Sequence, residues 1–89
     1  MINISIVYSD EQQIEKVRDF DNTSLTFNFI NIATKKGRKA GWALKNYWGA
    51  SSDPFAIVLK GEKPIKAFYS ESCDVIAELL KYLSNKEYE

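Results

Sequence analysis

The chain has 89 residues, 45% of them hydrophobic and 13% aromatic, which predicts a single domain, residues 1–89, around one hydrophobic core. It contains no histidine and one cysteine, Cys73, which excludes an internal disulfide, a Cys-x-x-Cys motif and the usual histidine-based catalytic and zinc sites. Its 12 basic and 12 acidic residues cancel at pH 7, and because P-loop and dinucleotide-binding motifs are also absent we expect no cofactor and no metal.

The N-terminal sequence MINISIVYSDEQQ has no basic leader, and Asn3 and Ser5 interrupt its apolar run, so it does not resemble a secretion signal. No apolar run approaches the roughly 20 residues that a membrane-spanning helix needs. We therefore expect a soluble, cytoplasmic protein that does not enter a membrane.

Charge is unevenly distributed along the chain. Residues 1–21 have a net charge of −3 and residues 53–89 a net charge of −2. Residues 22–52 contain no acidic residue and five basic ones: Lys35, Lys36, Arg38, Lys39 and Lys45. This basic middle third is the main electrostatic feature of a neutral protein.

The first half of the chain predicts two strands and a helix. Residues 2–8 and 25–32 are rich in β-branched and aromatic residues and alternate in polarity, which is typical of strands. Ser9 or Asp10 can cap the helix between them, and residues 21–24 predict a turn. The apolar residues of this helix recur at helical spacing: Ile14, Val17 and Phe20.

The second half predicts a helix, a hairpin and a final helix. Thr34 is the expected N-cap of a helix over 34–48, and Gly49 the residue that ends it. Residues 55–60 and 64–69 flank a Gly-Glu-Lys turn and predict an antiparallel hairpin. A helix capped by Ser70 or Ser72 follows, and residues 84–89 predict a frayed tail. The apolar stripe of the last helix is Val75, Ile76, Leu79, Leu80 and Leu83.

The order β-α-β-α-β-β-α predicts an α/β fold. Strands that are separated by helices are normally parallel, whereas the final hairpin is antiparallel. We therefore expect a four-stranded mixed sheet with helices on both faces.

The segment YWGASSDPFAIVLKGEKP places Trp48-Gly49 at a helix end, then Pro54, then a strand and a tight turn. With the preceding INIATKKGRKAGWALKN, this spacing resembles the thioredoxin/glutaredoxin-like superfamily over residues 25–83, while residues 2–20 match it by topology only. The resemblance implies a thioredoxin-like fold in which Pro54 is the cis-proline that begins a buried strand.

The chain departs from this family at the redox centre. The family places its Cys-x-x-Cys after the first strand, where this chain has Ser9, Asp10, Glu11 and Gln12. The dithiol chemistry is therefore not implied, and the chain resembles a divergent, redox-inactive member. In redox members, the backbone before the cis-proline binds an extended thiol substrate, which predicts a groove for a peptide or small ligand here. Its expected lining is Tyr8, Ser9, Asp10, Asp53, Pro54 and Ser70. The alternative is that Pro54 only shapes the entry to the strand.

A second candidate is Cys73, which we expect in the first turn of the last helix, where a thiol can become reactive. Together with Asp74 it is loosely similar to the Cys-Asp element by which glutaredoxins hold glutathione, although the glycine pair that precedes that element is missing. A monothiol or glutathione-handling enzyme that uses Cys73 is therefore an alternative, and a packed cysteine without a role is another.

A third candidate is the helix over 34–48. Its spacing predicts that Ala40, Ala43, Leu44 and Tyr47 face the sheet and that Trp42 lies nearly opposite them. The outward basic and aromatic residues would be Lys35, Arg38, Lys39, Trp42 and Lys45. Such a face suits an acidic protein or a nucleic acid, or a second copy of the chain; alternatively, Trp42 folds down to cover exposed sheet.

The sequence therefore favours a binding module over an enzyme, and a protein over other partners. The expected surfaces are the Pro54 groove and the basic face around Trp42. A Cys73-dependent enzyme and a nucleic-acid-binding protein are the alternatives, and a homodimer through Trp42 is a further arrangement that the residues permit.

Overall fold

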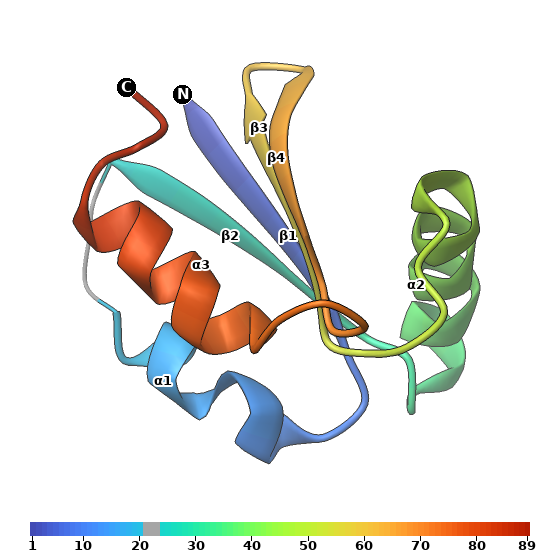
Figure 1. Ribbon diagram of the computed structural model, residues 1–89. Helices are drawn as coiled ribbons and strands as arrows, with labels where there is room; N and C mark the ends of the chain where they lie inside the picture. The colour runs from blue at the N-terminus through green and yellow to red at the C-terminus, as the bar shows by residue number, and fades with distance from the viewer. Residues whose placement is uncertain (21–23) are drawn as a thin grey trace.

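A computed structural model describes residues 1–20 and 24–89 of the chain. It shows an α/β fold with one four-stranded mixed sheet, in the order β2-β1-β3-β4, and three α-helices (Figure 1). Apart from Ser24, the turn expected at 21–24 lies outside the described residues. The elements are β1 (Ile2–Tyr8), the 3-10 helix η1 (Glu11–Ile14), α1 (Glu15–Arg18), β2 (Leu25–Asn31), α2 (Lys35–Trp48), β3 (Phe55–Lys60), β4 (Lys63–Tyr69) and α3 (Val75–Ser84).

The strand directions confirm one part of the expectation and correct another. β1 and β2 are parallel, with Ile4 opposite Phe27, and β3 and β4 form the expected antiparallel hairpin. However, β3 runs antiparallel to β1, with Ile4 opposite Val58, although a helix separates β2 from β3. The expectation that all strands separated by helices are parallel is therefore wrong for β3.

The course of α2 explains the reversed direction of β3. Gly37 of α2 lies against the carbonyl of Asn31 at the end of β2, and the Trp48 carbonyl accepts a 2.8 Å hydrogen bond from the hydroxyl of Tyr69, at the end of β4. The helix thus crosses the sheet near one end instead of returning to the start of β2. Because Phe55 begins β3 at this same end, opposite Val7, the strand has to run back.

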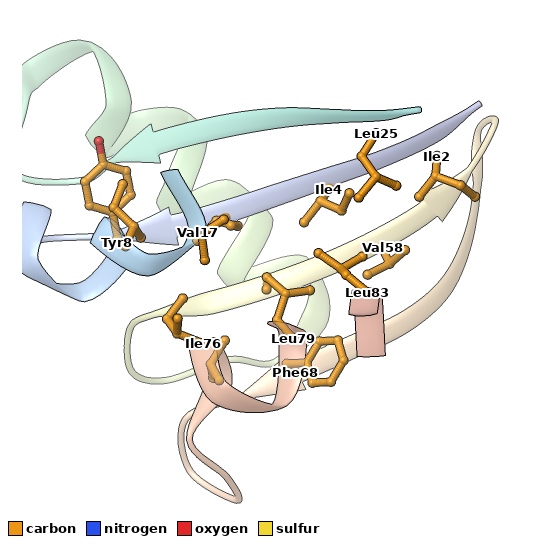
Figure 2. Packing of buried hydrophobic residues seen from close by; sticks show 14 of the residues in the cluster. Ile2, Ile4, Tyr8, Val17, Leu25, Val58, Phe68, Ile76, Leu79 and Leu83 are labelled. Atoms are coloured by element: carbon orange, nitrogen blue, oxygen red, sulfur yellow. The ribbon is translucent and has the colours of Figure 1, made fainter. Parts of the chain in front are cut away.

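One face of the sheet is covered by α1 and α3 (Figure 1). Alternate residues of β1 point to this face, as the period of two in a strand requires, and meet the apolar stripe of α3 (Figure 2). The stripe predicted for the last helix is confirmed, with Leu80 only partly buried, and so is the burial of Ile14 and Val17. The buried cluster on this face includes Ile2, Ile4, Ile6, Tyr8, Val58, Phe68, Val75, Ile76, Leu79 and Leu83.

The other face is covered by α2, which is rotated relative to the sequence-based expectation. Thr34 caps the helix by accepting a 3.0 Å hydrogen bond from the Gly37 N–H, and Gly49 ends it at φ 72°, both as predicted. However, Ala40, Ala43 and Tyr47 are exposed, so the face assigned to the sheet is wrong apart from half-buried Leu44. The residues that face the sheet are Gly37, Gly41, Leu44, Lys45 and Trp48.

Gly41 fixes this rotation. A Cβ atom at position 41 would lie 2.3 Å from Cγ2 of Ile32 and 3.1 Å from Cγ1 of Val7, too close for any side chain. The glycine therefore marks the point of closest approach between helix and sheet, and the alanines lie on the opposite side.

The expectation of a frayed tail over residues 84–89 is wrong for Tyr88, which is buried. The ring of Tyr88 is buried and lies 6.4 Å from the ring of Tyr82, and it belongs to the same cluster as Leu25. Among the described residues, no helix combines the length and the apolar character that crossing a bilayer requires.

We predict that Gly41→Ala lowers the free energy of unfolding by about 1–3 kcal/mol, since overpacking at a tight contact outweighs the roughly 1 kcal/mol that alanine gains in helix propensity. Urea denaturation measures this change. Ala43→Ser on the exposed side of α2 is the control and should shift the free energy by less than about 0.5 kcal/mol. A stabilised Gly41→Ala variant would contradict the close approach.

Candidate functional site

The loop before β3 is joined to the loop after β1, as the groove prediction requires. The Asp53–Pro54 peptide bond is cis, as expected from the sequence. The hydroxyl of Ser9 donates a 2.5 Å hydrogen bond to Oδ2 of Asp53, and the side-chain amide of Gln13 donates to the same oxygen at 3.4 Å. The structure therefore brings Ser9, Asp53 and Pro54 together.

Asp10 lies beside this loop, but its carboxylate is committed to the start of η1. It caps the helix by accepting a 3.0 Å hydrogen bond from the N–H of Gln12, while Gln13 accepts from the N–H groups of Ser9 (2.9 Å) and Asp10 (3.2 Å). This reciprocal capping satisfies backbone donors that a helix start would otherwise leave unpaired. Asp10 thus holds the start of η1 in place through Oδ1, while its side chain stays exposed.

Tyr8 does not line the groove. It continues the inward alternation of Ile4 and Ile6, so its ring is buried against α1 and its hydroxyl donates a 3.0 Å hydrogen bond to Glu11 and accepts one from Arg18 at 3.2 Å. Burial, followed by the hydrogen bond to Glu11, raises the pKa of the Tyr8 hydroxyl above its ordinary value of 10.0. Arg18 also pairs with Glu11 at 3.1 Å and lies 4.4 Å above the ring of Phe29.

Ser70 reaches the proline loop from the other side through a hydrogen-bond network that the sequence did not reveal. Its Oγ lies 2.9 Å from Oγ of Ser52, which donates a 2.5 Å hydrogen bond to Glu71. Glu71 also accepts from the backbone N–H groups of Ser51 and Ser52, and the hydrogen bond from Ser52 is the main reason why its pKa is lowered. The sequence gives no sign of this network, because Ser52 is 18 and 19 positions away from Ser70 and Glu71 and belongs to no periodic pattern.

Pro54 opens onto a hollow of about 280 Å³ between η1, α1 and α3. Its lining mixes both signs of charge with amides and a little apolar surface, which fits no single ligand class. The lining residues are Gln12, Gln13, Glu15, Lys16, Pro54, Asp74, Ile76 and Ala77.

Lys45 does not belong to the exposed basic face. Only 9% of the residue is exposed, and its Nζ lies 3.9 Å from Oδ1 of Asp53. The reason is the rotation of α2, which places position 45 one turn beyond Gly41 on the side that meets the sheet. The predicted exposure of Lys45 is therefore wrong, and the residue instead connects α2 to the proline loop.

The remaining members of the basic face are exposed. The side chains of Lys35, Arg38 and Lys39 are in solvent, and Trp42 is 58% exposed among them. Tyr47 is 82% exposed farther along the same helix and was missed because its spacing from Ala40 and Ala43 suggested a buried stripe. Trp42 and Tyr47 lie about 140° apart around the helix, so Trp42 alone stands among the cations. An aromatic ring of this kind can dominate the binding energy where a partner covers it.

The two predicted surfaces are continuous. A hollow of about 320 Å³ lies between Trp42 and the proline loop, and Lys45 forms part of it. It is lined by Ile32, Trp42, Lys45, Asn46, Ala50, Ser51 and Asp53. A ligand that covers Trp42 can therefore also contact Asp53, next to Pro54.

Cys73 lies apart from this surface. The N-cap of α3 is Asp74, which accepts from the N–H of Ala77 at 3.3 Å, so Cys73 precedes the helix and the expected cap at Ser70 or Ser72 is wrong. Its half-buried Sγ lies 3.4 Å from the Tyr69 carbonyl, to which it donates. The thiol borders a hollow of about 420 Å³ with Lys66, Phe68 and Tyr82, and not the hollow that contains Pro54.

Within residues 1–20 and 24–89, no three acidic or cysteine side chains converge in a way that could hold a metal ion. Comparison of the chain with protein-family models and with curated proteins gives no match.

We predict that stability falls as the pH rises above about 10, because the Tyr8 hydroxyl binds its proton more tightly in the folded chain than in the unfolded chain. The contribution of Tyr8 to stability is fully present below the pKa that its hydroxyl has in the unfolded chain. It is lost as the pH rises through the higher pKa of the folded chain. Tyr8→Phe should flatten this decline and cost about 1 kcal/mol at neutral pH through the lost hydrogen bonds. Thermal unfolding between neutral and alkaline pH measures both effects.

Tyr82, whose pKa is also raised by burial, should contribute in the same direction, so that Tyr8→Phe alone leaves part of the decline. Tyr47→Phe, at an exposed ring, is the matched control. A Tyr8→Phe variant with the same alkaline decline as the original protein would contradict the prediction.

Proposed function

We propose that this protein is a binding module with a thioredoxin-like fold and without the redox chemistry of that family, and that it binds an acidic partner protein in the cytoplasm. The partner would cover the α2 surface, which we define as Lys35, Arg38, Lys39 and Trp42 with the adjoining Asp53 hollow. The observation that carries this proposal is the exposure of Trp42 at the junction of the basic helix and the proline loop.

The arrangement of elements supports the proposed fold. The sheet is mixed, its last two strands form a hairpin, and helices cover both faces in the order that the sequence resemblance implies. The loop that contacts Asp53 begins with Ser9, at the place where the family has its Cys-x-x-Cys, so the proposed corner would have the family's shape without its thiols. Such a corner can still receive an extended segment of a partner.

The charge of the α2 surface indicates the chemistry of the partner. Residues 22–52 contain no acidic side chain, and the first turn of α2 adds the partial positive charge of a helix N-terminus to Lys35 and Arg38. Exposed cations around a central aromatic ring favour a partner whose own surface is acidic with an apolar centre. The cations would mainly speed association, and Trp42 would supply most of the affinity.

Binding of nucleic acid is less well supported than binding of a protein. With Lys45 turned toward Asp53, the exposed cations of this helix are confined to its first turns: Lys35, Lys36, Arg38 and Lys39. Affinity for a phosphate backbone depends on the number of phosphates neutralised, and four side chains on one short segment cover few of them. Thiol chemistry at Cys73 is also less well supported, because its Sγ donates to the Tyr69 carbonyl, a neutral acceptor that does not favour the thiolate.

We predict that Trp42→Ala weakens partner binding about 30-fold or more, because truncation of a central aromatic residue typically costs 2 kcal/mol or more. Partners would be captured from extracts of the native host with the immobilised full chain, identified, and measured against each variant by surface plasmon resonance. Arg38→Glu should chiefly slow association and reduce its dependence on salt.

Lys66→Glu, a matched charge reversal on β4, is the control and should leave binding unchanged. A captured protein that binds Trp42→Ala as tightly as the original chain would overturn the α2 surface as the binding site. Capture that disappears after nuclease treatment, together with a salt-sensitive electrophoretic shift of nucleic acid, would favour the nucleic-acid alternative instead.

We predict that the protein shows no turnover in an insulin-disulfide or glutathione mixed-disulfide reduction assay, because no thiol follows β1 and the part-buried Cys73 donates its hydrogen to the Tyr69 carbonyl, a neutral acceptor that does not favour the thiolate. Cys73→Ser should bind the partner as the original chain does. Reductase turnover that Cys73→Ser abolishes would overturn the redox-inactive assignment, whatever the outcome of the binding experiments.

A further inference from the structure

We infer that the chain forms a two-fold symmetric homodimer in which the β2 edges of two copies pair antiparallel and extend the sheet across both molecules. This inference goes beyond the proposed function and does not depend on it, because it is carried by β2, and only the cations at the start of α2 belong to both surfaces. It rests on the contrast between the two edges of the sheet, the residues of β2, and the charges at its two ends.

The β4 edge carries the features by which proteins prevent edge-to-edge association. Its exposed residues include Lys63, Pro64 and Lys66, and the pairing with β3 shifts register between Val58 and Leu59. Charged side chains, proline and an irregular register each disfavour the addition of another strand. Association at β4 is therefore opposed.

The β2 edge carries none of these features. Residues 22–34 contain no charged residue and no proline, and β2 pairs with β1 in unbroken register over all seven of its residues, Leu25–Asn31. Aromatic and β-branched side chains give this strand a high propensity for sheet. An uncharged edge of this kind is a template for a further strand, and the same molecule protects its other edge.

The side chains of β2 define the register of self-pairing. Phe27 and Phe29 stack on each other with ring centroids 5.8 Å apart, half-buried on the face covered by α1 and α3. With the two-fold axis at Asn28, the second copy's Phe29 lies opposite Phe27, and its Phe27 opposite Phe29. The four phenylalanine rings then form one two-by-two cluster across the paired strands, and aromatic cross-strand pairs stabilise antiparallel sheets.

The opposite face of β2 has room for the second copy. A hollow of about 510 Å³ lies beside the strand at the start of α2. Its lining includes Asn28, Ile30, Asn31, Thr34, Lys36 and Ala40. In the register centred on Asn28, the second copy's Thr26 and Asn28 point toward this hollow, and both are small enough to enter it.

The charges at the two ends of β2 select the antiparallel orientation. The end of β2 leads into Lys35, Lys36, Arg38 and Lys39. The start of β2 lies near the C-terminal tail, because Tyr88 packs in the same cluster as Leu25 (Figure 1), and in this tail Glu87 and Glu89 outnumber Lys86. Antiparallel pairing sets the basic end of each copy beside the acidic end of the other, whereas parallel pairing would set like charges together.

The expected dimer is reversible, because an interface built on one seven-residue strand is at the small end of specific interfaces. Sedimentation equilibrium of the full chain over a wide concentration range should show a monomer that doubles in mass. Asn28→Lys places two like charges opposite each other at the axis and should raise the dissociation constant about tenfold or more. Lys66→Asn, the reverse exchange on the β4 edge, should leave it unchanged.

Cysteine cross-linking tests the register without relying on stability. In a Cys73→Ser background, Asn28→Cys should form a disulfide-linked dimer on mild oxidation, since its Cβ atoms face each other at the axis. In the same register, position 26 of one copy lies opposite position 30 of the other. A mixture of the Thr26→Cys and Ile30→Cys variants should therefore form disulfide-linked heterodimers, whereas each variant alone should cross-link poorly. A chain that remains monomeric at every concentration and fails to cross-link at Asn28 would overturn the inference, as would a dimer that Asn28→Lys leaves intact.

Discussion

The missing side chain at position 41 allows α2 to lie on the sheet, and much of the molecule follows from that contact. Cγ2 of Ile32 occupies space that any Cβ at this position would need, so the helix is held by Gly41 against β1 and β2. This contact determines which residues of α2 turn inward and which remain in solvent. Lys45 is brought to Asp53, and Trp42 and Tyr47 are left outside.

The inward turn of Lys45 links the helix to the loop that carries Pro54. Asp53 receives the ammonium group on one oxygen and hydrogen bonds from Ser9 and Gln13 on the other, so three segments of the chain meet at one carboxylate. Ser52, Ser70 and Glu71 hold the neighbouring residues from the opposite side. The loop is thus fixed by polar contacts at its flanks, and the hollow beside Trp42 has a defined shape.

Several parts of this arrangement were predictable from the sequence, and the reasons for success and failure are physical. Thr34, Gly49 and the stripe of α3 follow from capping chemistry and a strong apolar period, which depend only on local residues. The rotation of α2 was missed because alanines and tyrosine looked more apolar than glycines, although close packing selects the smallest residue.

Tyr8 was misplaced because the loop after it suggested a groove, whereas the strand alternation that buries Ile4 and Ile6 also buries Tyr8. The contacts of Ser52 with Glu71 join residues 19 positions apart, beyond the reach of any local pattern.

The burial of Tyr88 has a practical consequence for handling the molecule. It holds the C-terminus at the end of the sheet where β1 and β2 begin, and the N-terminus lies at the same end (Figure 1). Pro54 and the start of α2 lie at the opposite end of these seven-residue strands, about 20 Å away. A surface linker or a fused reporter at either terminus would therefore leave α2 and the proline loop pointing into solution, whereas a bulky fusion at the C-terminus would crowd the start of β2.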